Sequence, residues 1–365
     1  MNSDNGILQE TPAESEVSSK YICTANHGFA PYAQEELRRA FGSVKSTLLV
    51  PGEVFAATLK ASAFQVAEQL SRREPMFLRH LFLVEWEWQL PNESERSDTP
   101  ITQGEWLADL LQFLLADSRL AGKKLAIQTR KAEGSLWSGS AAELKDAIQE
   151  GLAELDAEFA VRASDLIVSV FAAKDAVYAG VNVPEANLSD WNGGAIRFQR
   201  EEGQISRAKF KLLEAEAVFG IDFAAFHEAL DIGAAPGGWT SFLLERGLKV
   251  TAVDPAKLHP DVLASPRLTH VRKNAASVKF RENQFDLLVC DMSWSPKLTA
   301  RMVADLLYAL VPGGTAVVTV KLLGKKPMAL IQEVTGMFQE ARLQVQRAKQ
   351  LFHNRDEITL YMIKY

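Results

Sequence analysis

The sequence predicts an α/β protein whose C-terminal half is a doubly wound, largely parallel sheet preceded by two small α+β domains. After Ser206, apolar runs of strand length alternate with helical patterns, as in parallel sheets. Residues 231–239 read Asp-Ile-Gly-Ala-Ala-Pro-Gly-Gly-Trp and join the first of these strands to a helix. Before Ser206 the predicted elements are shorter, and polar stretches divide them into two groups.

Length and composition limit the class of protein. At ~100–200 residues per domain, the 365 residues suggest two or three domains, and 47% hydrophobic with 24% charged residues is an ordinary globular composition. No apolar run approaches the ~20 residues of a membrane span, so no membrane partner is expected. Residues 1–20 are polar and acidic and predict a disordered leader rather than a signal peptide. The cysteines, Cys23 and Cys290, lack metal or redox spacing, which predicts a cytoplasmic protein without a metal site.

The charge is distributed unevenly along the chain. Residues 206–365 hold 21 Lys+Arg and 16 Asp+Glu (+5), whereas residues 1–205 hold 19 and 30 (−11), which together give −6. Clustered positive charge can neutralise phosphates even on an acidic protein, although a solvated charged face is the alternative. The sequence therefore permits an RNA partner. The clusters are Arg207, Lys209 and Lys211; Lys321, Lys325 and Lys326; and Arg342, Arg347, Lys349 and Arg355.

The N-terminal half contains two α+β patterns. Residues 21–90 predict a ferredoxin-like domain with strands at 21–25, 54–59 and 80–88 and helices at 32–41 and 61–72. A polar linker follows at 91–99. Residues 100–183 predict a second domain with helices at 104–115 and 141–155 and strands at 124–130, 165–171 and 176–181. Residues 184–205, which are rich in Asn and Gly, predict another linker.

The domain at 206–365 carries the parallel-sheet pattern. Its expected helices are 207–219, 240–246, 296–310 and 327–340. Its expected strands are 228–232, 248–253, 269–272, 285–291, 315–321, 344–351 and 357–363.

The glycine-rich turn predicts a nucleotide site. Gly233, Gly237 and Gly238 carry no side chain that would keep a ligand from the backbone, and the turn leads to the free N–H groups of a helix N-terminus. The next strand ends in Asp254, at the position where a doubly wound sheet binds the hydroxyls of a ribose. The chain is therefore expected to bind a cofactor that contains adenosine.

The spacing of the turn does not suit a dinucleotide. The NAD fingerprint G-x-G-x-x-G is absent, and Pro236 has no N–H to offer a pyrophosphate. The turn instead resembles the first motif of S-adenosylmethionine-dependent methyltransferases of the FtsJ type, which implies a class I (Rossmann-like) methyltransferase domain. In that family Asp254 would bind the ribose, and Asn274 would accept the adenine amine through its carbonyl. The cofactor-binding residues that the resemblance implies are Gly233, Ala235, Pro236, Gly237, Gly238, Trp239, Asp254, Asn274 and Asp291.

The fourth predicted strand ends in a sequence that suits a hydroxyl acceptor. Asp291-Met292-Ser293-Trp294 lacks both the Pro-Pro-Tyr that accompanies amine methylation and the Pro-Cys of 5-methylcytosine enzymes. A ribose 2′-OH is a weak acid, so a general base must take its proton. A lysine can serve if its pKa is lowered by burial or a nearby cation.

The resemblance extends to four catalytic residues. Within Arg-Ala-Lys-Phe-Lys-Leu at 207–212, Lys211 matches the first lysine of the FtsJ-type Lys-Asp-Lys-Glu tetrad, and Asp291, Lys321 and Glu357 match the rest. The resemblance implies that Lys321 is the base, that Asp291 and Lys211 position and tune it, and that Glu357 orients Lys211 or the acceptor ribose. We expect the four side chains to meet at the carboxyl edge of the sheet.

The whole chain resembles the RlmM family of cytidine 2′-O-methyltransferases of large-subunit (23S) ribosomal RNA. Residues 321–326 and 350–357 resemble its C-terminal segments, and Ala-Asn-His-Gly-Phe at 25–29 resembles its N-terminal region. This implies a THUMP RNA-binding domain at 100–183, for which Lys123, Lys124, Arg130 and Lys131 are a hypothetical RNA patch. Two alternatives remain open: the same chemistry on another RNA such as tRNA, and an RNA assembly factor with dispensable catalysis. The intact tetrad argues against the second.

Overall fold

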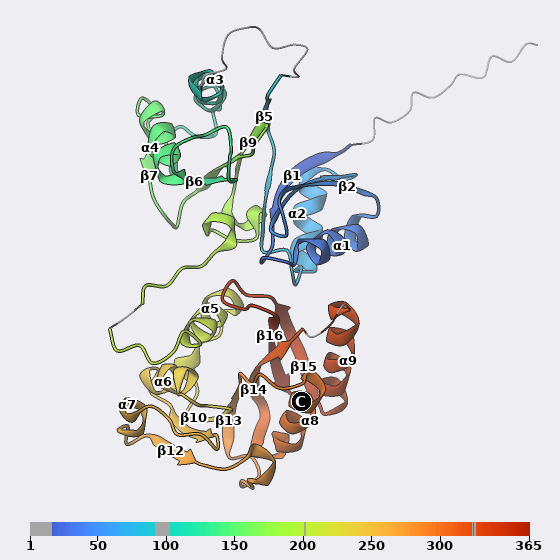
Figure 1. Ribbon diagram of the computed structural model, residues 1–365, viewed down its shortest axis with the longest axis vertical. Coiled ribbons are helices and arrows are strands. Elements are labelled where there is room, and N and C mark those ends of the chain that lie inside the picture. The colour runs from blue at the N-terminus through green and yellow to red at the C-terminus, as the bar shows by residue number, and fades with distance from the viewer. Residues whose placement is uncertain (1–16, 92–102, 201, 323, 325) are drawn as a thin grey trace, which may run out of the picture. The chain divides into compact units, whose positions relative to one another are not determined.

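The computed structural model describes residues 17–91, 103–200, 202–322, 324 and 326–365 (Figure 1). Most of the predicted leader, residues 92–99 of the first linker, and Lys325 lie outside the described residues. Residues 19 and 20, assigned to the leader by the sequence, begin strand β1 (Ser19–Thr24). Within these ranges, no helix combines the length and the apolar character that crossing a membrane requires.

The chain folds into two compact units. The first comprises residues up to Thr24, Ala30–Glu74 and His80–Asp190. The second comprises Trp191–Tyr365 and also two short segments from the N-terminal half, Ala25–Phe29 and Pro75–Arg79.

The first unit contains a four-stranded antiparallel sheet in the order β2-β3-β1-β4. Its elements follow one another as β-α-β-β-α-β: β1, α1 (Ala30–Phe41), β2 (Val44–Val50), β3 (Val54–Leu59), α2 (Ala63–Arg72) and β4 (His80–Leu83). Ser62 and Gln65 form a capping box that begins α2. Strand β2 is absent from the sequence prediction because it is an edge strand with mostly exposed residues, so it has no buried alternation to detect.

A second sheet in the same unit has the order β5-β9-β8-β6-β7. The single strand predicted at 80–88 is wrong: β4 pairs with β1, whereas β5 (Trp86–Gln89) pairs with β9. Gly180 makes the crossing possible, since a Cβ there would lie 1.8 Å from the carbonyl oxygen of Leu83. The remaining elements are α3 (Gln103–Leu115), β6 (Lys124–Lys131), α4 (Ala141–Gly151), β7 (Glu158–Phe159), β8 (Leu166–Ala172) and β9 (Ala176–Asn182).

The second unit contains a seven-stranded sheet in the order β12-β11-β10-β13-β14-β16-β15. Neighbouring strands from β12 to β14 are parallel, and β16 is antiparallel to both of its neighbours. The predicted doubly wound sheet is confirmed. Its strands are β10 (Glu228–Ile232), β11 (Lys249–Val253), β12 (Leu268–Val271), β13 (Phe285–Cys290), β14 (Leu310–Lys321), β15 (Leu343–Lys349) and β16 (Glu357–Lys364).

The helices of this unit lie near their predicted positions: α5 (Lys209–Phe219), α6 (Gly238–Glu245), α8 (Pro296–Leu306) and α9 (Pro327–Glu340). Helix α7 (Pro260–Leu263) is an addition. Strand β14 begins five residues earlier than predicted, because its register against β13 jumps from Leu310 to Thr315 and the intervening Pro-Gly-Gly resembles a loop in the sequence.

The core of the second unit is built on both faces of the sheet. On one face, Leu212 of α5 and Phe242 of α6 pack in one cluster with Val289 of β13 and Val317 of β14. Strand residues of opposite parity point to the other face, where α8 and α9 lie together (Figure 1). The parity of a strand residue therefore decides whether it faces α5.

Candidate active site

Strand parity places three predicted catalytic residues on the face that carries α5. Val289 and Val317 belong to the cluster around α5. Side chains two residues apart on a strand share a face, so Asp291 follows Val289, and Lys321 follows Val317, on this face. Antiparallel pairing sets Lys321 opposite Glu357, which adds Glu357 to the same face.

Lys211 joins the two carboxylates at this edge. Its Nζ lies 2.9 Å and 3.1 Å from the two carboxylate oxygens of Asp291 and 2.6 Å from Oε1 of Glu357. Thr319 fixes Asp291 further, because its hydroxyl donates a 2.6 Å hydrogen bond to Oδ1. Only 16% of the Lys211 side chain and 6% of that of Glu357 are exposed. Three of the four predicted tetrad residues therefore form one largely buried ion-pair cluster.

The cluster keeps Lys211 charged. Burial disfavours the ammonium, but the negative charges of Asp291 and Glu357 and their hydrogen bonds outweigh it and raise the pKa of Lys211 above its ordinary value. A lysine in this state donates hydrogen bonds and cannot accept a proton at neutral pH. The proton acceptor of the site must be another group.

Lys321 is the fourth predicted residue and ends β14. Its register partner is Glu357, and the next residue, Leu322, donates its N–H to the carbonyl of Asp356 at 2.6 Å. The half-buried Lys321 thus lies on a backbone that is hydrogen-bonded on both sides of the Lys321–Glu357 pair. Its side chain shares a face with Thr319, which contacts Asp291.

The glycine turn is shaped by backbone conformation and by protein neighbours. Gly233 and Gly237 have φ of +74° and +116°. A Cβ on Gly233 would lie 2.3 Å from Cγ of Met292, and one on Gly238 would lie 2.8 Å from Cβ of Ser206. The sequence attributed these glycines to ligand access alone. They are also needed because Met292 and Ser206 pack directly against the turn.

Trp239 has a role that the sequence did not predict. Its side chain is 3% exposed and lies in the core, where the indole N–H donates to the carbonyl of Ala208 at 2.8 Å. This bond joins α6 to the start of α5, the helix that carries Lys211. The indole N–H is therefore bonded within the protein and stabilises the packing of α6 against α5.

Other groups around the turn fit an adenosine cofactor. Helix α6 begins at Gly238, and its N-cap residue Gly237 provides no side-chain cap, so the first N–H groups of the helix are available to a ligand. Asp254 accepts the N–H groups of Ala235 (3.1 Å) and Ala256 (2.8 Å), which orients its carboxylate at the end of β11. The exposed Asn274 caps a 3₁₀ turn by accepting the N–H of Ala276 through Oδ1, which retains a second lone pair.

The first residue of the turn, Asp231, is buried beneath it. Its carboxylate accepts a 2.6 Å hydrogen bond from Thr240, and burial, reinforced by the charges of Asp291 and Asp254, raises its pKa to about 7. An aspartate that ends the first strand could have been suspected from the motif, but its burial was not visible in the sequence.

A pH-dependent stability follows from Asp231. The folded protein keeps this proton up to about pH 7, whereas the unfolded chain loses it near its ordinary pKa, so this residue lowers stability as pH rises between those values. Asp231→Asn retains an oxygen for Thr240 and removes the charge. We expect the variant to gain about 4 kcal/mol relative to wild type at pH 8 and little at pH 4, measured by urea unfolding. An equal gain at both pH values would contradict a titrating Asp231.

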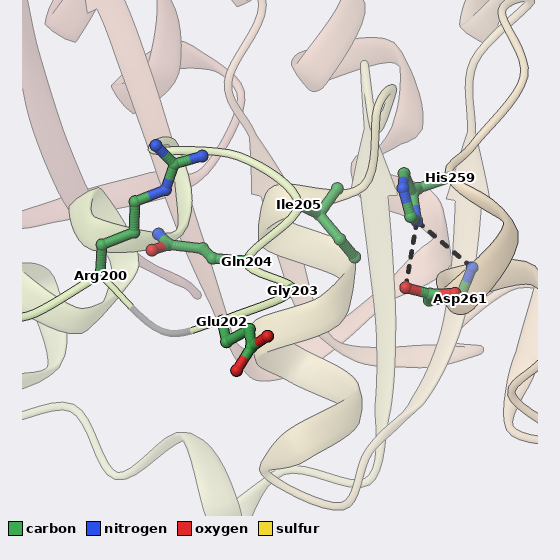
Figure 2. A pocket seen from close by; sticks show the side chains of 7 residues that line it. All are labelled: Arg200, Glu202, Gly203, Gln204, Ile205, His259 and Asp261. Carbon is green, nitrogen blue, oxygen red and sulfur yellow. Dashed lines mark hydrogen bonds and ion pairs between the residues drawn. The ribbon is translucent and has the colours of Figure 1, made fainter.

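A cavity of about 600 Å³ lies beside the turn (Figure 2). The N–H of His259 donates to the carbonyl of Pro236 at 2.9 Å, so one wall is bonded to the turn itself. Gln204 lies two residues before Ser206, which packs on Gly238. The cavity is therefore bounded by segments that contact the glycine turn. Its lining residues are Arg200, Glu202, Gly203, Gln204, Ile205, His259 and Asp261.

Several of the predicted basic residues serve the fold. The 6%-exposed Lys209 pairs with Glu245 at 2.8 Å, and the buried Lys349 donates to the carbonyl of Pro75 at 3.4 Å. Arg347 lies over the ring of Phe219. Arg207, Lys326, Arg342 and Arg355 are exposed and remain candidates for phosphate contact. Within the described residues, no group of three or more His, Cys, Asp or Glu side chains is arranged to hold a metal ion.

Comparison with known proteins agrees with this geometry. Residues 204–353 match the FtsJ-like methyltransferase family. The chain is 35% identical over 207 residues to a ribosomal RNA large subunit methyltransferase M from Methylococcus capsulatus, covering 53% of this chain and 56% of that protein. It is 27% identical over 321 residues to the ribosomal RNA large subunit methyltransferase M from Marinobacter nauticus, covering 82% of this chain and 85% of that protein.

The similarity to a third relative extends beyond the FtsJ-like region. The chain is 32% identical over 304 residues to the ribosomal RNA large subunit methyltransferase M of Laribacter hongkongensis, covering 74% of this chain and 85% of that protein. Both the sheet order and the turn at its carboxyl edge suit such an enzyme. The chain belongs to the family of ribosomal RNA large subunit methyltransferase M, whose members are S-adenosylmethionine-dependent methyltransferases with an FtsJ-like domain.

Proposed function

We propose that this protein methylates the ribose 2′-OH of a cytidine in large-subunit (23S) ribosomal RNA, in the cytoplasm. The observation that carries the chemistry is the ion-pair cluster of Lys211, Asp291 and Glu357, with Lys321 in register opposite Glu357. The printed names of the relatives support the class of RNA. The absence of Pro-Pro-Tyr or Pro-Cys after β13 supports a hydroxyl acceptor.

The proposed reaction divides the work among the four residues. S-adenosylmethionine supplies an electrophilic methyl group. Lys321 takes the proton of the 2′-OH as its oxygen forms the new bond to carbon and the carbon–sulfur bond breaks. Asp291, held by Thr319 and Lys211, positions the Lys321 ammonium as it forms. Lys211 stays charged and holds Asp291 and Glu357 in place at the site.

The cofactor would be held by the glycine turn, by Asp254 and by Asn274. The free N–H groups at the start of α6 suit a carboxylate or a polar backbone group of the methionine end. The lone pairs of Asp254 that remain beside Ala235 and Ala256 suit ribose hydroxyls. The set Gly233, Ala235, Pro236, Gly237, Gly238 and Trp239 would contribute its backbone alone.

The first unit is proposed to comprise a ferredoxin-like domain followed by a THUMP-like RNA-binding domain. The β-α-β-β-α-β order of the first sheet supports the former. The suggested RNA patch of the second is smaller than the sequence implied. Arg130 donates to Thr24, Lys131 donates to the carbonyls of Trp137 and Gly139, and Lys124 pairs with Glu158 at 3.5 Å, which leaves Lys123 as the exposed cation of the patch.

Mapping of 2′-O-methyl groups tests the substrate. Ribosomal RNA from cells with and without the gene is compared nucleotide by nucleotide, and we expect the loss of one methylated cytidine in the large-subunit RNA. Purified protein should restore that group with S-adenosylmethionine. An unchanged ribosomal map would refute this substrate, and a lost methyl group in tRNA would favour the alternative RNA.

A further inference from the structure

We propose that Asn26 and Arg79, which precede the methyltransferase domain by more than a hundred residues, are positioning residues for the active site. They hold the loop at 350–356 and thereby fix Glu357 against Lys211. The expected effect on catalysis rests on the proposed function. The contacts of Asn26 and Arg79 with the loop lie within the second unit and do not depend on that function.

The loop directly precedes Glu357, the first residue of β16. Asn354 organises it from within, since its Oδ1 accepts the N–H of Leu351 at 2.8 Å and the hydroxyl of Thr359 at 3.1 Å. Gln350 closes it by donating to the carbonyl of Arg355 at 3.0 Å. The position of Glu357 therefore depends on how this loop is held.

Asn26 binds the loop at two points. Its Nδ2 donates to the carbonyl of Leu351 at 2.8 Å and to that of Asn354 at 3.1 Å, and the residue is 8% exposed. Two buried carbonyl groups from the two sides of the loop are thus satisfied by one amide. Asn26 belongs to the Ala-Asn-His-Gly-Phe sequence at 25–29, to which the proposed chemistry assigns no role.

Arg79 fixes the side chain of Asn26. Its guanidinium donates to Oδ1 of Asn26 and, through Nε, to the carbonyl of Gly193 at 3.0 Å. The bond to Oδ1 determines which end of the amide points at the loop. The guanidinium also lies over the ring of Phe352, a loop residue, with 5.1 Å between Cζ and the ring centroid.

The opposite side of the loop is bound to the helix of Lys211. Glu214, one helical turn after Lys211, is 2% exposed and accepts the N–H groups of Phe352 (2.6 Å) and His353 (2.9 Å). The loop is therefore held between α5 on one side and Asn26 with Arg79 on the other. These contacts fix the distance between α5, which carries Lys211, and β16, which carries Glu357. The 2.6 Å ion pair between the two side chains depends on that distance.

The decisive variant is Asn26→Asp in the full chain. It has the same shape and keeps an acceptor for Arg79, but it replaces both N–H donors by an oxygen that faces two carbonyl oxygens. We expect faster hydrogen exchange in the peptide 350–357 and unchanged exchange in the peptide 231–240, where the cofactor turn lies. Affinity for S-adenosylhomocysteine should stay within twofold. The single-turnover methyl-transfer rate should fall about tenfold, because a misplaced catalytic group loses transition-state stabilisation.

A double-mutant cycle separates positioning from general destabilisation. If Asn26 acts through Glu357, Asn26→Asp should cost no more than about twofold in a Glu357→Gln background. Lys297→Ala, which removes one side of a half-exposed ion pair on α8, is the control and should change neither exchange nor rate. Arg79→Lys is a second variant, which retains the positive charge. It should show the same faster hydrogen exchange in the peptide 350–357 as Asn26→Asp.

Each result decides a separate point. Unchanged hydrogen exchange in the peptide 350–357 would show that Asn26 does not hold the loop. Faster exchange with an undiminished methyl-transfer rate would overturn the positioning role. Rate losses that are additive between Asn26→Asp and Glu357→Gln would overturn it as well. Absence of RNA methylation by the wild-type protein would instead refute the proposed function, and the exchange measurement would still decide whether Asn26 and Arg79 hold the loop.

Discussion

Replacement of Lys321 by alanine is expected to reduce the single-turnover rate of methyl transfer by about 10³-fold, the range that a general base contributes. Lys211 cannot substitute for it, because Asp291 and Glu357 hold the Lys211 ammonium in its charged form. Cofactor affinity should be unchanged, since Lys321 ends β14 whereas the proposed cofactor residues follow β10, β11, β12 and β13. The measurements are transfer of a labelled methyl group and calorimetric binding of S-adenosylhomocysteine.

A matched lysine control is available on α8. Lys297 pairs with Glu333, and both side chains are about half exposed, so Lys297→Ala should change activity little. If Lys321→Ala retained full transfer, Lys321 would not be the base. If it also lost S-adenosylhomocysteine binding, its effect would be on the cofactor site.

Replacement of Lys211 by methionine is expected to destabilise the fold as well as to stop catalysis. Without the ammonium, the carboxylates of Asp291 and Glu357 face each other in a largely buried site, and removing one partner of such a cluster costs about 3 kcal/mol or more. The loss should appear as a lower free energy of unfolding at neutral pH.

Urea unfolding of wild type and variant at neutral pH tests this loss. Lys209→Met, two residues earlier on α5, is the matched control: its partner Glu245 is about half exposed and can return to water. The control should cost about 1 kcal/mol at most. Equal losses for the two variants would argue against a cluster that depends on the Lys211 charge.

Much of the second unit was predictable because its signals are local. Strands such as Glu228–Ile232 are continuous apolar runs, and the motif at 231–239 occurs at a fixed place in a doubly wound sheet. The convergence of Asp291, Lys321 and Glu357 also follows from the sequence once the sheet order is known, because strand parity places all three on one face. What the sequence could not give is the sheet order itself.

Features that depend on distant contacts were missed. The exposed edge strand β2 has no core pattern, and the division of residues 80–89 between two sheets depends on Gly180, almost a hundred residues away. The hydrogen bond from the Trp239 indole to Ala208 was also missed, because the two residues are 31 positions apart in the sequence. Glu214 resembles an ordinary helix-surface residue until the loop at 350–356 is known to lie against it.

The reversed direction of β16 has a consequence for how such a site could arise or be redesigned. Only the last residues of each parallel strand lie at the catalytic edge. Asp291 directly after β13 and Lys321 at the end of β14 are such residues. Because β16 runs the other way, it enters the sheet at that edge with its first residue, Glu357. A shift of β16 by one residue would turn this carboxylate to the opposite face and leave Lys211 with a single counter-charge. Insertions or deletions at 350–356 should therefore be tolerated far less well than in other surface loops of this domain.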